Sequence, residues 1–225
     1  MGQKVNPINY RIGSTFTWKS RWFAGKKDYS DNLVEDYKLR KYLGDKLANA
    51  GLVQVDIERS LTTIKIIIHV SRPGVVIGRG GANLEIVKKA LERILNVSKL
   101  KKDKVKVDLK VEEVKVPDLS ARLIAQRISD QLSKRYPHRR ATAQALDKAM
   151  AAGAKGIKIC LSGRISGAEI ARTEKYSRGS VPTQTIRANI DYHQVPALTR
   201  SGYVGIKVWI HKGDIVDKNQ NSVKQ

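Results

Sequence analysis

The stretch RPGVVIGRGGANL, residues 72–84, decides the fold of this chain because it joins two kinds of periodic sequence. Apolar residues alternate with other residues before it and recur at helical spacing after it. Within it, the turn from Gly78 to Gly81 carries one arginine and no acid. Glycine lets the backbone approach a ligand closely, and a helix that begins after the turn offers free N–H groups to a phosphate. The turn is therefore either a phosphate-binding loop or a simple connection between two helices.

Hydrophobic periodicity predicts the elements on both sides of this turn. A helix is expected from about Asp31, as its N-cap, to Ala50, where Gly51 suits the C-cap. Alternating apolar residues then predict strands, and an apolar stripe at helical spacing predicts a helix after the turn. These further elements are strands at 53–57, 64–70 and 105–111, a turn at 60–62, a short helix at 73–77, a helix at 84–94 and a lysine-rich linker at 99–102.

The third of these strands alternates apolar residues with Lys104, Lys106 and Lys110. Lysines in such a strand either face RNA or protect an exposed sheet edge from aggregation, and we favour the edge.

A dinucleotide-binding loop is the competing interpretation of the glycine turn. Gly78 and Gly80 begin a GxGxxG pattern, but Asn83 stands at its third glycine position. The expected short helix at 73–77 also separates the turn from the preceding strand. With its apolar flanks, the VIGxxGxxL pattern of residues 76–84 instead resembles the signature of KH domains, whose GxxG loop clamps single-stranded nucleic acid. The element order resembles the type II form, αββααβ.

The charge of the whole chain points to a polyanionic partner. Its 225 residues include 43 Lys and Arg against 21 Asp and Glu, a formal net charge of +22, while 41% hydrophobic residues are enough for packed cores. Cationic side chains that neutralise phosphates release counterions, so we expect a nucleic-acid partner. Residues 117–212 hold 17 basic and 6 acidic residues and are the most basic part.

Other classes of site lack support in the sequence. Cys160 is the only cysteine, which excludes an intrachain disulfide and favours a reducing compartment. The four histidines are scattered, so no metal site is expected, and no cofactor motif is found. We expect no signal peptide and no membrane span, because no apolar run approaches the ~20 residues that a bilayer requires.

A second domain is expected to follow Pro117, which interrupts the strand pattern. Two helices, at 119–132 and 138–152, and three main strands, at 157–161, 186–192 and 204–210, predict a two-layer α/β domain. The overall class is therefore α+β. The expected domains are a basic aromatic arm at 1–30, a type II KH domain at 31–116, the C-terminal α/β domain at 117–212 and a flexible tail at 213–225.

The arm interleaves Trp18, Trp22 and Phe23 with lysine and arginine. Such aromatic side chains either stack on bases or pack on the domain behind them, and the sequence leaves both interpretations open.

Ordered blocks along nearly the whole chain carry a more specific resemblance. They are MGQKVNP at 1–7, GAKGIK at 153–158, SGR at 162–164, GAEIARTE at 167–174, VP at 181–182, RANIDY at 187–192 and GIKVWI at 205–210. In these blocks the chain resembles the universal KH-containing ribosomal protein family of the small subunit, S-three, in its bacterial form. The resemblance implies a cytoplasmic, ribosome-bound structural protein of the subunit head, with small-subunit rRNA, mRNA and the head proteins S-ten, S-fourteen and S-two as partners.

The resemblance also implies site residues. Arg139 and Arg140 match basic positions at the mRNA entrance channel that are tied to mRNA unwinding, and the patch at this entrance is completed by Lys134 and Arg135. The chain has Ala143 and Gln144 where further basic residues are common in the family. In the GxxG loop, formed by Gly78, Arg79, Gly80 and Gly81, the family often has two lysines in place of Arg79 and Gly80.

Further rRNA contacts are expected in the arm and in a long loop between strands. The expected residues are Lys4, Arg11, Trp22, Arg164, Arg172, Lys175 and Arg178. The loop is expected to dock on rRNA or on a neighbouring head protein. The spacings of Glu169 to Arg172 and of Glu174 to Arg178 are equally suited to surface ion pairs.

Two other functions compete with the ribosomal one. A free-standing KH regulator would explain the GxxG loop but not the ordered C-terminal blocks. An enzyme that nicks damaged DNA through a lysine has precedent among relatives outside bacteria, but no nucleophile–base pair or paired carboxylates are visible, so no enzymatic activity is expected. Any unwinding would use ribosomal translocation as its motor, since no ATP-binding motif is present.

Overall fold

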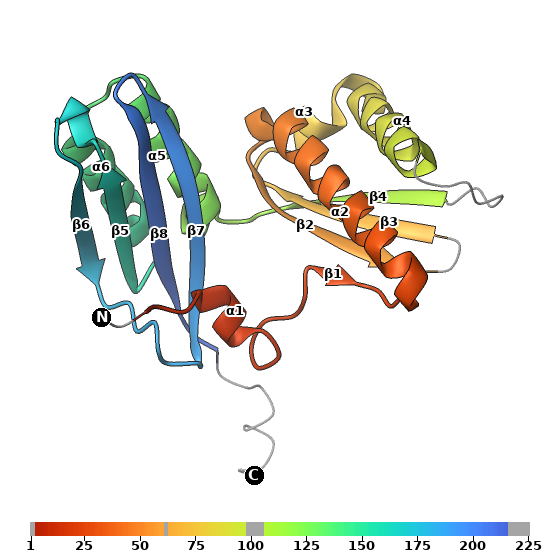
Figure 1. Cartoon of the computed structure of the whole chain (residues 1–225), viewed down its shortest axis with the longest axis horizontal. Helices are drawn as coiled ribbons and strands as arrows, with labels where there is room; N and C mark the ends of the chain where they lie inside the picture. The colour runs from red at the N-terminus through yellow and green to blue at the C-terminus, as the bar shows by residue number, and fades with distance from the viewer. Residues whose placement is uncertain (1–2, 61–62, 98–105, 216–225) are drawn as a thin grey trace, which may run out of the picture. The chain divides into compact units, whose positions relative to one another are not determined.

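The computed structural model describes residues 3–60, 63–97 and 106–215 and divides the chain into two compact units (Figure 1). One unit contains residues 18–115, and the other contains residues 3–17 together with 116–215. The expected arm at 1–30 is therefore not a unit of its own, because its two halves belong to different units. The expected linker at 99–102, the start of the third strand at Val105 and most of the expected tail lie outside the described residues.

The first unit, which we call the KH unit, has the predicted αββααβ order. Its elements are β1 (Ser20–Arg21), α2 (Lys26–Lys46), the 3-10 turn η1 (Ala48–Ala50), β2 (Leu52–Arg59), β3 (Thr63–Val70), α3 (Pro73–Ile77), the 3-10 turn η2 (Arg79–Gly81), α4 (Ala82–Val97) and β4 (Lys106–Glu113). The sheet order is β1-β2-β3-β4, with β2 and β3 antiparallel and the outer pairs parallel. α2 and α4 contact each other on one face of this sheet (Figure 1).

The apolar stripes form one core in the KH unit. Leu39 and Leu43 of α2 are fully buried against Ile57, Ile66 and Ile68 of the sheet. Each fully buried aliphatic side chain contributes about 1.5–3 kcal/mol relative to an exposed one, so these positions stabilise the contact of helix and sheet.

Two boundaries in this unit differ from the prediction. α2 begins at Lys26 with Gly25 as its N-cap, so the prediction of Asp31 as N-cap was wrong. Its first turns are polar and exposed, and they carry no apolar stripe that marks a start. β1 was missed because a two-residue strand is too short to show alternation.

The second unit, which we call the C-terminal unit, places two helices on one face of an antiparallel sheet (Figure 1). Its elements are α1 (Pro7–Arg11), the 3-10 turn η3 (Pro117–Leu119), α5 (Ala121–Ser133), α6 (His138–Ala151), β5 (Gly156–Gly163), the 3-10 turn η4 (Ile165–Gly167), β6 (Arg172–Gly179), β7 (Ala188–Thr199) and β8 (Gly202–Asp214). The sheet order is β6-β5-β8-β7. The inward side chains of β5 and β8 pack against Ile128 of α5 and Ala149 of α6.

This sheet has four strands where three main strands were predicted. β6 occupies part of the segment that we expected to be a long loop, and it pairs antiparallel with β5 from Arg172 opposite Gly163 to Gly179 opposite Gly156. Its sequence RTEKYSRG is polar on both faces, with only Glu174 and Tyr176 partly buried, so it lacks the apolar alternation of a recognisable strand. The segment is thus an ordered edge strand, and the prediction of a loop there was wrong.

No helix in the described ranges is both long enough and apolar enough to cross a membrane.

Candidate nucleic-acid interface

The GxxG loop is an exposed turn that depends on glycine at three positions. Gly78, Gly80 and Gly81 have φ angles of 71°, 61° and 83°, in the left-handed region that side chains disfavour. A Cβ at Gly78 would also lie 2.8 Å from the side chain of Asn83, which donates to the carbonyl oxygen of Val75 at 3.3 Å. A side chain at Gly78 would therefore clash with Asn83, whereas side chains at Gly80 and Gly81 would meet open space.

Arg79 is exposed at the tip of this loop, as expected for a phosphate contact. Apolar side chains beside it remain exposed: Val75 at 48%, Ile77 at 41% and Ile86 at 55%. An exposed cation next to uncovered aliphatic side chains suits a nucleotide, whose phosphate and base require both kinds of contact.

Trp22 is half-buried in the KH unit, where its contacts are with protein groups, and its expected RNA contact stays a prediction. Its indole N–H donates to the carboxylate of Asp36 at 2.8 Å, and its ring lies 5.4 Å from the ring of Tyr29. Of the two interpretations of the arm aromatics, packing therefore applies to Trp22. Trp18 and Phe23 remain 66% and 97% exposed.

Trp22 closes over a buried ion cluster. Arg59 contacts Glu35 at 2.7 Å, and its Nε donates to Asp36 at 2.8 Å, with all three side chains at most 7% exposed. Such a cluster is strongly destabilised when one partner is removed, because the remaining charge stays buried. It fixes the segment around β1 to α2 and β2.

Arg11 is fully buried in the C-terminal unit, so its assignment as an RNA contact was also wrong. Its guanidinium donates to the carbonyl oxygens of Ala188 at 2.7 Å, Pro7 at 2.9 Å and Thr185 at 2.7 Å. Burial lowers the pKa of this guanidinium. The residue stabilises the contact of α1 with β7, and no signal in the sequence distinguishes it from an exposed arginine.

The expected mRNA-entrance patch is brought together at the turn between α5 and α6. Lys134 and Arg135 follow α5, Arg139 and Arg140 lie in the first turn of α6, and all four are exposed. Arg140 lies 5.6 Å from the ring centroid of Tyr136. None of the four forms an ion pair with an acidic residue in the described part of the chain, unlike Arg127, which pairs with Asp118 at 2.9 Å.

His138 anchors the start of α6 behind this patch. Its Nδ1 lies 2.7 Å from the hydroxyl of Ser166, and its Nε2 lies 3.0 Å from a carboxylate oxygen of Glu174 in β6. The Tyr176 hydroxyl donates to the same carboxylate, and this bond, with Arg172 and His138 nearby, lowers the pKa of Glu174. The network fixes α6, and with it Arg139 and Arg140, to the sheet.

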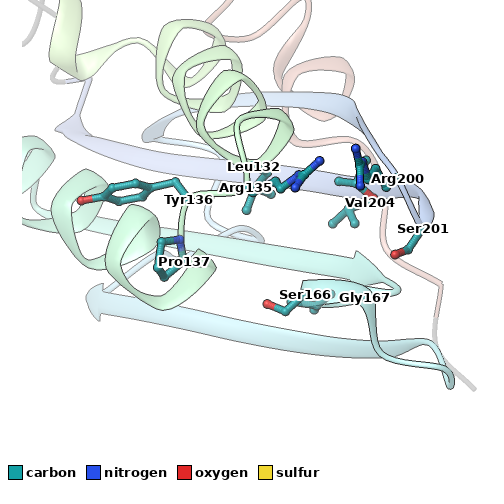
Figure 2. A pocket seen from close by; sticks show the side chains of 11 residues that line it. Leu132, Arg135, Tyr136, Pro137, Ser166, Gly167, Arg200, Ser201 and Val204 are labelled. Atoms are coloured by element: carbon teal, nitrogen blue, oxygen red, sulfur yellow. The ribbon is translucent and has the colours of Figure 1, made fainter.

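A pocket of about 350 Å³ opens beside the patch, and Figure 2 shows Arg135 and Arg200 on one side of it and Ser166 on the other. Leu132 and Val204 add apolar surface to its lining. Arg135 and Ser166 have φ angles of 61° and 56°, a conformation that costs a non-glycine residue on the order of 1–3 kcal/mol and is concentrated at functional sites. The volume is at the lower end of roughly 300–1,000 Å³ for small-ligand sites.

The remaining expected rRNA contacts are divided between two faces. Arg172 donates to Glu174 at 2.7 Å and Arg178 pairs with Asp147, so these two arginines are neutralised on the helix side of β6. These pairs replace the expected ones to Glu169 and Glu174, because the segment is a strand and not a helix. Arg164 is exposed and donates to the carbonyl oxygens of Ala168 and Ser201.

Lys175 lies on the opposite face of β6, where the structure places Lys4 and Lys175 beside Lys158. Lys158 was not among the site residues predicted from the sequence. The alternation with buried Ile157 and Ile159 already predicted that its side chain lies on the face away from the core.

In the described ranges, no group of three or more His, Cys, Asp or Glu side chains is arranged to hold a metal ion.

Two family models match the chain, each mostly within one of the two units. The model described as a KH domain matches residues 38–119, and the model described as the C-terminal domain of ribosomal protein S3 matches residues 128–210.

Curated relatives match nearly the full length. The small ribosomal subunit protein uS3 of Caldicellulosiruptor saccharolyticus is 47% identical over 216 residues, which are 96% of this chain and 94% of the relative. The proteins of the same name from Caldanaerobacter subterraneus subsp. tengcongensis and Persephonella marina are each 48% identical over 223 residues, 99% of this chain and 97% and 95% of the relatives. With the KH unit, the second unit and these identities together, the chain belongs to the uS3 family of small ribosomal subunit proteins.

Proposed function

We propose that this protein binds rRNA in the head of the small ribosomal subunit and that its patch Lys134, Arg135, Arg139 and Arg140 contacts mRNA at the entrance channel. The observation that carries the proposal is the absence of acidic partners for these four exposed cations among the described residues, because neighbouring arginines such as Arg127 and Arg178 do have acidic partners. Four uncompensated cations at one turn repel each other, and a phosphate backbone removes that repulsion.

Single-stranded mRNA fits this surface better than a duplex. The pocket next to Arg135 has apolar lining for an unpaired base, and Arg135 and Arg200 can neutralise its phosphate (Figure 2). A protein that holds the unpaired strand favours the open form of an mRNA hairpin. The work of opening comes from translocation, because the chain has no nucleotide triphosphate motif.

The family resemblance extends the proposal to the head proteins S-ten, S-fourteen and S-two as neighbours and to the cytoplasm as the compartment. The GxxG loop is a second RNA contact in this proposal, to rRNA or to mRNA.

The test is translation by reconstituted subunits that carry R139A/R140A. We expect slower passage through an mRNA hairpin and an unchanged rate on an unstructured message. R127A/K148A is the matched control, because it removes the same charge from α5 and α6 outside the patch. Equal rates of R139A/R140A and wild type on the hairpin would refute the role at the entrance channel, and loss of R139A/R140A from subunits would assign the patch to assembly.

A further inference from the structure

One face of the C-terminal sheet is free of helices except near the start of β7, where α1 packs, and it carries lysine and aromatic side chains. α5 and α6 cover the other face (Figure 1). Ile157, Ile159 and Leu161 belong to the core between that face and the two helices. Alternation along β5 therefore places Lys158 and Ser162 on the uncovered face. We call this surface, away from the end that α1 contacts, the open face.

Aromatic side chains lie at both ends of the open face. Tyr192 of β7 and Trp209 of β8 are direct cross-strand partners, with ring centroids 5.1 Å apart and planes tilted by 39°. At the β7–β8 hairpin, Leu198 and Tyr203 are also partners and are 62% and 67% exposed. Trp209 and Tyr203 are six residues apart on one strand, about 20 Å at ~3.4 Å per residue.

Three lysines lie on this face near the two aromatic pairs: Lys207 on β8 between Tyr203 and Trp209, and Lys158 and Lys175 on the neighbouring strands β5 and β6. Lys175 and Lys207 are the cross-strand partners of Cys160 on its two sides, and Lys158 is two residues before it. The ammonium group of Lys158 lies 5.7 Å from the ring centroid of Trp209. Burial lowers the pKa of Lys158, and the charges of Lys4 and Lys175 lower it further.

Among the residues that the structure describes, no Asp or Glu lies beside these lysines on the same stretch of the sheet. The residues that alternate onto it are Tyr192, Gln194, Pro196, Leu198, Tyr203, Gly205, Lys207, Trp209, Lys158, Cys160, Ser162, Thr173, Lys175 and Ser177. On the helix side of the same edge strand, by contrast, Arg172 and Arg178 have carboxylate partners. The positive charge is thus segregated to the open face.

This combination selects single-stranded nucleic acid. Uncompensated lysines favour a polyanion, and the exposed ring of Tyr203, with the half-exposed rings of Tyr192 and Trp209, offers surface on which unpaired bases stack. A duplex would present phosphates but no accessible base faces, so the rings would remain unused. An acidic protein could form ion pairs with the lysines, but its negative charge would not account for the aromatic side chains on the same face.

We propose that the open face binds an unpaired segment of RNA, with bases stacked on Trp209, Tyr192 and Tyr203 and phosphates against Lys158, Lys175 and Lys207. This inference rests on the proposed function that the protein binds RNA, but it concerns a surface separate from the patch and the GxxG loop.

The test uses the full chain, a ten-nucleotide oligouridine and an RNA duplex with the same number of phosphates. We expect W209L to weaken oligouridine binding about tenfold, within the ~1–3 kcal/mol of one base–aromatic stack, and to leave duplex binding unchanged. We expect K158Q/K207Q to weaken binding and to reduce the salt slope by about 1.4, at ~0.7 per phosphate contact of a single strand. K41Q/K148Q removes two exposed lysines from α2 and α6 and is the charge control.

A second variant, at an exposed aromatic residue, separates an effect on RNA binding from an effect on folding. Tyr203 is 67% exposed, so Y203A removes a ring at little cost in stability, and we expect it to weaken oligouridine binding severalfold. Oligouridine affinities of W209L and Y203A equal to that of wild type would overturn the inference. If R139A/R140A weakened oligouridine binding and the open-face variants did not, the proposed function would stand and the open face would be excluded as an RNA-binding surface. Variants that bind oligouridine normally but fail to enter subunits would assign the face to a protein partner and also overturn the inference.

Discussion

The side-chain Nε of Arg11 lies 2.7 Å from the carbonyl oxygen of Ala188, 177 residues later in the chain. Because the guanidinium also donates to Pro7 and Thr185, one side chain joins α1 to the start of β7 and to the segment before it. The N-terminal segment is therefore a structural part of the C-terminal unit and not a free arm.

We expect R11A to lower the free energy of unfolding of the C-terminal unit by about 2–4 kcal/mol, because it leaves several buried carbonyl oxygens without a donor. R11K should recover little of this loss, since an ammonium group cannot reproduce the planar fork of donors. Urea unfolding followed by near-UV circular dichroism measures the effect. K4A, at an exposed position of the same segment, is the control, and equal stabilities of R11A and K4A would contradict the prediction.

The GxxG loop is expected to contact phosphate, and paired Asp and Asn substitutions test this because the two side chains have nearly the same shape. G80D/G81D should weaken binding of single-stranded RNA at least tenfold through repulsion of phosphate. G80N/G81N imposes nearly the same side-chain volume at the same positive φ angles without charge, and asparagine tolerates this conformation. Fluorescence anisotropy compares the two, and an Asp variant that binds as well as the Asn variant would show that the loop only joins α3 to α4.

Ala143 stands where a basic residue is common in the family, so introducing a lysine there should strengthen RNA binding. Ala143 is exposed on α6 about one turn after Arg139 and Arg140, so A143K should add a third phosphate contact on this helix. We expect tighter binding of single-stranded RNA, a salt slope larger by about 0.7 and faster passage through an mRNA hairpin. A151K adds the same charge at the exposed last residue of α6, and a gain of equal size there would attribute the effect to net charge.

Glu174 gives a pH prediction. Its pKa is lowered from an ordinary value of 4.5 by the Tyr176 hydroxyl, and also by Arg172 and His138. A carboxylate with a lowered folded pKa contributes stability that is complete above the unfolded pKa and is lost as pH falls through the folded value. E174Q should therefore lower the melting temperature at pH 7, and the difference from wild type should shrink below about pH 4.5. Calorimetry between pH 3 and 7 measures this, and a difference that is constant with pH would contradict the role of the charge.

Apolar periodicity predicted most of the fold because most elements bury one regular stripe. The short helix from Pro73 to Ile77 and the start of α6 at His138 were predicted at their observed positions. β6 was not predicted, because an edge strand with polar side chains on both faces shows no such stripe. The first turns of α2 were missed for the same reason.

The candidate site was less predictable than the fold. The patch around Arg139 was found because its residues are consecutive or nearly so in the sequence. The burial of Arg11 depends on Ala188 and Thr185, far along the chain, and no local pattern marks it. The open face also required the pairing of β5, β6, β7 and β8, which brings Lys158, Lys175 and Lys207 together.

The discontinuous C-terminal unit has a consequence for biosynthesis. Arg11 is synthesised 177 residues before its partner Ala188, an interval on the order of 10–35 s at ~5–20 residues per second. The KH unit is continuous in sequence, so all of its residues are available in the nascent chain well before Ala188. Arg11 and α1 therefore remain without their partner strand until β7 has been synthesised.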